Sequence, residues 1–137
     1  MTTGAAQPQT RATLLALYDA AVAAAHPDVC LPPHLPLPPA DGRLYVVGAG
    51  KAAAAMAVAA EAHYRDLGVL DRVAGFTTAP HGTPEALRVP RPSVIGALSA
   101  RHPTPDEASV QSAERALALV ATAAKRDLVC GLHVLTN

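Results

Sequence analysis

Aromatic residues are scarce in this 137-residue sequence, which contains three Tyr, one Phe and no Trp. Proteins that bind single-stranded nucleic acid stack the bases on aromatic rings, so this scarcity disfavours that class of protein. The eleven Lys and Arg residues are balanced by eleven Asp and Glu residues and form no basic run. Neither a nucleic-acid surface nor a polybasic membrane patch is indicated, and we expect no partner of either kind.

Cysteine and long apolar runs are also scarce. The two cysteines, Cys30 and Cys130, match no metal-ligand spacing and are too few for a disulfide scaffold. The six histidines are scattered, without a pair at metal-ligand spacing. Residues 1–10 lead into no apolar run long enough for a signal peptide or a membrane span. We therefore expect a cytoplasmic protein whose side chains form no metal site.

Half of the residues are hydrophobic, which suits one compact core. Residues 11–25 place Leu14, Tyr18 and Ala21 at helical spacing and predict an amphipathic helix that ends before Pro27. Five prolines follow within residues 30–42 and favour an extended strap. Residues 1–42 are thus predicted to form an N-terminal helix and a proline-rich strap.

The sequence from residue 43 onward alternates between two kinds of segment. Short apolar, β-branched runs predict strands, and longer alanine-rich runs predict helices. We expect strands at 43–47, 72–78, 93–99 and 127–135, and helices at 51–68 and 104–125. This alternation predicts an α/β fold for residues 43–137, a Rossmann-like domain of three layers with a largely parallel sheet and helices on its faces.

The start and the buried face of the second of these helices can also be predicted. Thr104 is expected as the N-cap, with Pro105 at the first helical position and Glu107 completing a capping box. One stripe of apolar residues is expected to face the sheet. Its members are Val110, Ala113, Leu117, Val120 and Ala124.

The segment VVGAGKAA joins the first predicted strand to the first helix of this domain. A helix N-terminus disfavours a nearby cation, so Lys51 needs another reason for its position. One explanation is a solvated side chain; the other is that Lys51, the helix dipole and free N–H groups from Gly48 to Ala52 bind an anion together. Ligands of parallel α/β sheets bind beyond the carboxyl ends of the strands, which is where this turn lies.

Two phosphate-binding motifs can be tested against the same turn. A Walker-type P-loop is excluded, because Tyr45 and Ala52 occupy positions that need Gly and Ser or Thr. The dinucleotide pattern G-x-G-x-x-A is satisfied by Gly48, Gly50 and Ala53. The acidic residue expected at the end of the second strand is absent, so a nicotinamide site has only weak support.

Three segments, VVGAGKAAAAMA, GFTTAPHGT and ARHPTPDEASVQSAERALALV, occur in this order along the chain. Together they resemble the N-terminal domain of the glycerate 2-kinase family, also called the MOFRL family, some members of which are labelled hydroxypyruvate reductase. The resemblance implies a two-domain α/β enzyme with its active site between the domains. It also implies transfer of the γ-phosphoryl group of ATP, with magnesium, to the 2-hydroxyl of D-glycerate.

The resemblance assigns roles to residues of the first and third segments. Lys51 matches the active-site lysine of the family, and Gly48, Ala49 and Gly50 form its substrate- or nucleotide-binding turn. His102 and Asp106 match the same family through ARHPTPDE and become binding candidates. The alternative for Asp106 is a purely structural place in a first helical turn, and for His102 the ordering of a loop. His81 is expected to be structural or merely exposed.

The sequence departs from the family after Val129: the family continues through a strand into a glycine- and serine-rich phosphate loop, whereas CGLHVLTN follows here and contains no such loop. With no such loop and no second domain, we expect residues 43–137 to be a partial domain that is inactive alone. We also expect an open strand edge to cause self-association, the alternative being a soluble monomer. Two other functions remain open, an NAD(P)H-dependent reductase of the hydroxypyruvate type and a non-catalytic interaction module.

Overall fold

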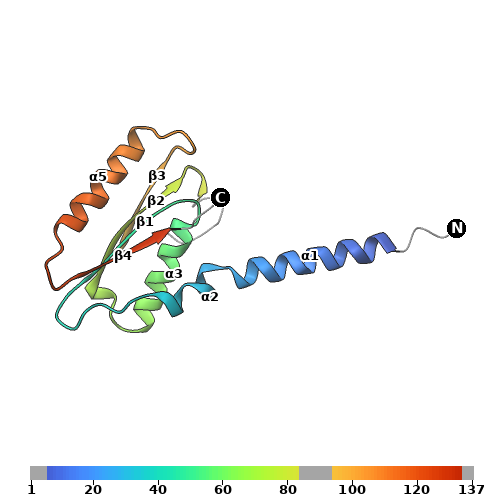
Figure 1. The fold of residues 1–137 in the computed structure, drawn as a ribbon, viewed down its shortest axis with the longest axis horizontal. Coiled ribbons are helices and arrows are strands. Elements are labelled where there is room, and N and C mark those ends of the chain that lie inside the picture. Colours follow the sequence, from blue (N-terminus) through green and yellow to red (C-terminus); the bar gives the residue numbers. More distant parts are fainter. Residues whose placement is uncertain (1–5, 84–93, 134–137) are drawn as a thin grey trace.

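The computed structural model describes residues 6–83 and 94–133 of the chain. Four parallel strands form one sheet in the order β3-β2-β1-β4 (Figure 1). The strands are β1 (Leu44–Ala49), β2 (Val73–Pro80), β3 (Ile95–Ala100) and β4 (Leu128–His133). The α-helices are α1 (Ala6–Ala24), α2 (Pro27–Cys30), α3 (Ala53–Asp66) and α5 (Glu107–Ala121), and short 3-10 turns cover Pro32–His34 and Leu70–Arg72. The prediction of a parallel α/β domain is confirmed; residues 93, 134 and 135 of the predicted strands lie outside the described residues.

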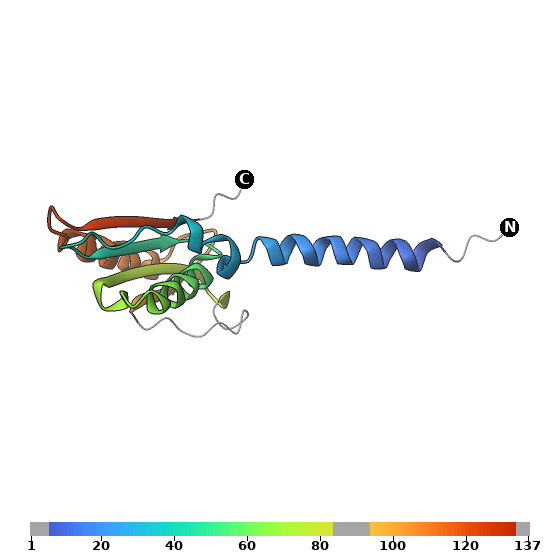
Figure 2. The same ribbon diagram turned by 90° about the horizontal axis from the view of Figure 1, so that it is seen from below.

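The helices α3 and α5 cover opposite faces of the sheet, giving three layers (Figures 1 and 2). On the α3 face, Leu44 and Val46 of β1 are fully buried in the main core together with Tyr64 of α3. On the α5 face, the hydroxyl groups of Thr78 and Ser112 form a hydrogen bond between β2 and the helix. Successive side chains of a strand point to opposite faces of the sheet, so each strand packs against the helices on both sides, as a sheet covered on both faces requires.

The helix α5 differs from the prediction in its start and in the face that it buries. Asp106, and not Thr104, is the N-cap, and Ser109 completes the capping box in place of Glu107. The expected apolar stripe is also wrong, because Val110 is 56% exposed and Leu117 is 71% exposed. Ser112 faces the sheet instead, since its small side chain and its hydrogen bond to β2 allow the helix to lie close.

The predicted N-terminal helix is confirmed as α1, which begins at Ala6 and extends away from the α/β body in both views (Figures 1 and 2). Its large apolar residues are exposed, including Leu14 at 61% and Tyr18 at 66%. The chain then returns to the body through α2 and the strap. No helix of the described residues is long and apolar enough to cross a membrane.

The proline-rich strap is held to the body by side chains that bind its carbonyl oxygens. The Tyr64 hydroxyl donates to the Pro36 carbonyl oxygen at 2.9 Å. The Arg72 guanidinium donates to the carbonyl oxygens of Pro39, Ala40 and Gly42. Proline supplies no backbone donor but keeps its acceptor, so donors on the body are the natural partners of such a segment.

We predict that Tyr64→Phe lowers the free energy of unfolding by about 1–2 kcal/mol, because the Pro36 carbonyl oxygen loses a buried donor. The matched control is Tyr18→Phe, which removes the same hydroxyl from a side chain that is 66% exposed. Urea denaturation followed by circular dichroism measures both variants. Equal midpoints for the two variants would show that the bond to the strap does not stabilise the fold.

Candidate functional site

The strand order places a ligand site at one edge of the sheet. The chain passes from β1 to β2 to β3 in one direction and then returns to β4 on the other side of β1. In an open parallel sheet, ligands bind outside the carboxyl ends of the strands near such a reversal. The turn after β1, the loops after β2 and β3 and the end of β4 all meet at this edge.

Two glycines shape the turn after β1. A Cβ on Gly48 would lie 2.7 Å from the Leu132 carbonyl oxygen of β4, so only glycine fits between the neighbouring strands. Gly50 has a φ of 121°, a backbone conformation that side chains of L-residues rarely adopt. Its N–H donates to the Thr78 carbonyl oxygen of β2 at 3.0 Å. Both glycines are therefore required by the local backbone structure, and without side chains they leave the turn open toward solvent.

Lys51 and Ala52 follow in a turn, and α3 begins at Ala53. The N-terminus of α3 has no acidic residue in its first turn and no side chain that caps it. Its first N–H groups and the positive end of the helix dipole therefore face the same edge as the exposed Lys51 side chain. This combination suits an anionic group such as a phosphate or a carboxylate.

The N-terminus of α5 lies nearby and is closed by its own cap. Asp106 Oδ1 accepts hydrogen bonds from the N–H of Ser109 at 3.1 Å and from the N–H of Arg101 at 3.3 Å. The Ser109 hydroxyl also donates to Oδ1 at 3.1 Å. Partial burial opposes ionisation, but these bonds and that from His81 outweigh it and lower the pKa of the Asp106 carboxyl. Asp106 is thus engaged as a structural cap.

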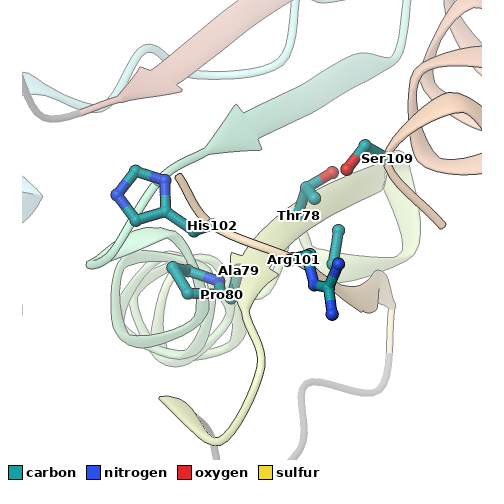
Figure 3. Close-up of a pocket in the computed structure, with 8 residues that line it drawn as sticks. Thr78, Ala79, Pro80, Arg101, His102 and Ser109 are labelled. Carbon is teal, nitrogen blue, oxygen red and sulfur yellow. The ribbon is translucent and has the colours of Figure 1, made fainter. Parts of the chain in front are cut away.

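A cavity of about 110 Å³ lies between the turn after β1, the end of β2, the end of β3 with the loop after it, and the start of α5. Its wall consists of Gly50, Thr78, Ala79, Pro80, Ala100, Arg101, His102 and Ser109. Figure 3 shows Thr78 and Ser109 with their hydroxyl groups turned toward each other, while Arg101 and His102 point to different sides. The structure therefore brings two predicted residues, Gly50 and His102, into one wall.

A second cavity, of about 390 Å³, lies between α5 and the ends of β1 and β4. Its wall consists of Val47, Gly48, Ala49, Thr78, Ser109, Ser112, Ala113, Ala116, Gly131, Leu132 and His133. Gly48 and Ala49, both predicted from the sequence, belong to this wall. Thr78 and Ser109 line both cavities and were missed, although Thr78 ends a predicted strand and so occupies a typical binding position.

His81 follows β2 and is also part of this edge. Its Nε2 lies 3.5 Å from Asp106 Oδ2, forming an ion pair when the imidazole is protonated. This pairing was not predictable from the sequence, because the β3 segment separates the two residues along the chain. Among the described residues, no group of three or more His, Cys, Asp or Glu side chains is arranged to hold a metal ion.

The fold is that of a parallel, three-layer α/β domain with a glycine-containing turn after β1. The fold gives only this class of protein, whereas comparison with protein families identifies a family. The model of the family described as "Domain of unknown function (DUF4147)" matches residues 13–133, so the chain belongs to this family. The resemblance to the N-terminal domain of the glycerate 2-kinase family is confirmed by this match and by the structural neighbour described next.

Similar proteins carry two different names. Two curated matches from Agrobacterium vitis have the provisional name hydroxypyruvate reductase. One is 40% identical over 122 residues, covering 89% of this chain and 26% of the relative. The other is 36% identical over 91 residues, covering 66% of this chain and 21% of the relative. A crystal structure of a Thermotoga maritima glycerate kinase matches with a TM-score of 0.66 and 26% identity, over 90% of this chain and 28% of that one. The chain spans about a quarter of the length of these proteins.

Proposed function

We propose that this chain provides the anion-binding edge of a glycerate 2-kinase, which transfers a phosphoryl group from ATP to the 2-hydroxyl of D-glycerate. The observation that carries the proposal is the N-terminus of α3, which has neither a cap nor an acidic residue and begins beside Lys51. The structural likeness to a glycerate kinase gives independent support. Hydroxypyruvate reductase, the name of the Agrobacterium vitis relatives, is the second candidate.

In this proposal, Lys51 and the N–H groups of the first turn of α3 stabilise negative charge on the substrate carboxylate or on the phosphoryl group. Phosphoryl transfer depends mainly on positioning and on stabilisation of charge, and a lysine at a helix N-terminus supplies both. The glycines of the turn allow the ligand to approach the backbone closely. His102 stands in the wall of the smaller cavity, where it can contact the same ligand.

ATP and magnesium are the cofactors of the proposed reaction. The exposed turn from Gly50 to Ala53 is where the chain can hold phosphate groups. For magnesium, the described residues contain no group of three or more His, Cys, Asp or Glu side chains that could hold a metal ion. We therefore assign no magnesium ligand among these residues.

We predict that Lys51→Met weakens the binding of ATP and D-glycerate by about tenfold or more, as loss of a charged hydrogen-bonding partner does. Lys125→Met is the matched control, because Lys125 is the other lysine of the sequence, is exposed and lies near the opposite edge, shortly before β4. Isothermal titration calorimetry measures both variants, and circular dichroism checks that both remain folded. Equal affinities for the two variants would contradict the role of Lys51.

A hydroxypyruvate reductase would require a particular residue at the end of β2. In dinucleotide-binding domains, an acidic residue near the end of the second strand binds the ribose. Here β2 ends with Thr78, Ala79 and Pro80, and the Thr78 hydroxyl is bonded to Ser112. The nicotinamide cofactor would therefore lack its usual ribose partner, although Gly48, Gly50 and Ala53 match the glycine pattern.

For this reason we predict that the chain does not bind NADH or NADPH at micromolar concentrations. Fluorescence titration of the reduced cofactor measures this directly, with ATP competition identifying any signal that comes from the proposed site. Saturable binding of either cofactor with micromolar affinity would favour the reductase over the kinase.

A further inference from the structure

His81 and Asp106 form an ion pair that has no part in the anion-binding role proposed for Lys51 and α3. Asp106 Oδ1 already accepts from Arg101 and from Ser109, so the orientation of the carboxylate is set by the cap of α5. The remaining oxygen, Oδ2, faces His81 Nε2 at 3.5 Å. Asp106 therefore presents one fixed acceptor to the imidazole.

The backbone of His81 is bonded to residues that line the smaller cavity. Its N–H donates to the Ala100 carbonyl oxygen at 3.0 Å, which joins the loops after β2 and β3. The preceding residue, Pro80, lines that cavity, as do Ala100 and Ser109. The side chain of His81 is 59% exposed, so a ligand bound at this edge can reach it.

The contact with Asp106 favours one tautomer of the neutral His81 imidazole. An ionised carboxylate only accepts hydrogen bonds, so a neutral imidazole that faces it through Nε2 carries its proton there. The lone pair then lies on Nδ1. Within residues 6–83 and 94–133, no hydrogen bond to Nδ1 of His81 is found. Among these residues Nδ1 has no hydrogen-bond partner, so it is available to accept a proton, as the histidine of an Asp–His pair does in catalysis.

We propose that His81 is the proton acceptor for the substrate hydroxyl and that Asp106 is its positioning residue; this inference rests on the proposed function. Nδ1 accepts a hydrogen bond from the 2-hydroxyl of D-glycerate. As the hydroxyl oxygen bonds to the γ-phosphorus of the nucleoside triphosphate, its proton moves to Nδ1. The bond from that phosphorus to the bridging oxygen breaks, and the nucleoside diphosphate leaves. Asp106 stabilises the imidazolium that results.

Other charged groups at this edge have distinct positions. Lys51 lies on the turn after β1, and Arg101 and His102 lie on the loop after β3. Within the described residues, the ion pairs of His81 include only the one with Asp106. The proposal therefore predicts that the tautomer of His81 responds to changes at position 106.

The first test measures the tautomers of chain labelled with 15N-histidine by long-range 1H–15N NMR in alkaline buffer. We expect the proton of His81 on Nε2, and loss of this preference in Asp106→Asn, because Asn keeps a helix cap but is not a carboxylate. Asp28→Asn is the matched control, since Asp28 pairs with a different histidine through Nδ1 of His26, at 3.3 Å. A proton on Nδ1 of His81, or an unchanged tautomer in Asp106→Asn, overturns the proposal.

The second test compares two acids that share a carboxylate. D-glycerate carries the 2-hydroxyl, and 3-hydroxypropanoate lacks it. We expect D-glycerate, but not 3-hydroxypropanoate, to shift the Nδ1 signal of His81, and His81→Ala to weaken D-glycerate binding by about tenfold. Equal shifts with both acids overturn the proposal.

The remaining outcomes separate this inference from the proposed function. D-glycerate that shifts the amide signals near Lys51 but leaves His81 unchanged shows that the anion site exists and that His81 is not its proton acceptor. If neither acid shifts any signal of the chain, the anion site is wrong, and the role of His81 fails with it.

Discussion

The close approach of β4 and β2 to the end of β1 is the constraint on which the site depends. Gly48 makes it possible, because any Cβ there would meet the Leu132 carbonyl oxygen at 2.7 Å and the Thr77 methyl carbon at 3.1 Å. With three strands ending side by side, their loops converge on one edge of the sheet. The bond from Gly50 to the Thr78 carbonyl oxygen then holds the turn against β2.

Two helix N-termini meet at this edge, and they differ in electrostatic character. The N-terminus of α5 is closed by Asp106, whose carboxylate binds its N–H groups and faces His81. The N-terminus of α3 has no such group and carries Lys51 beside it. Since both helices have a dipole of the same sense, capping only α5 leaves the N-terminus of α3 as the more favourable of the two for an external anion. The structural likeness to a glycerate kinase agrees with this arrangement.

The strands and helices were predictable because their apolar spacing is local information. The position of the turn around Lys51 was predictable for the same reason. The buried face of α5 was not, because Ser112 is selected by a hydrogen bond to Thr78, 34 residues away, and not by hydrophobicity. The pairing of His81 with Asp106 was also hidden, since only the parallel arrangement of β2 and β3 brings their following loops together. Sequence patterns predict helices and strands, whereas side-chain contacts between residues far apart in the chain depend on tertiary packing.

The most direct measurement of the central claim is an amide 1H–15N NMR map of the chain during addition of ATP. We expect the largest shifts from Gly50 to Ala54, at the uncapped start of α3, and little change in the amides of Glu107 to Val110 at the capped start of α5. Equal shifts at the two helix starts, or the largest shifts along α1, would contradict the central claim.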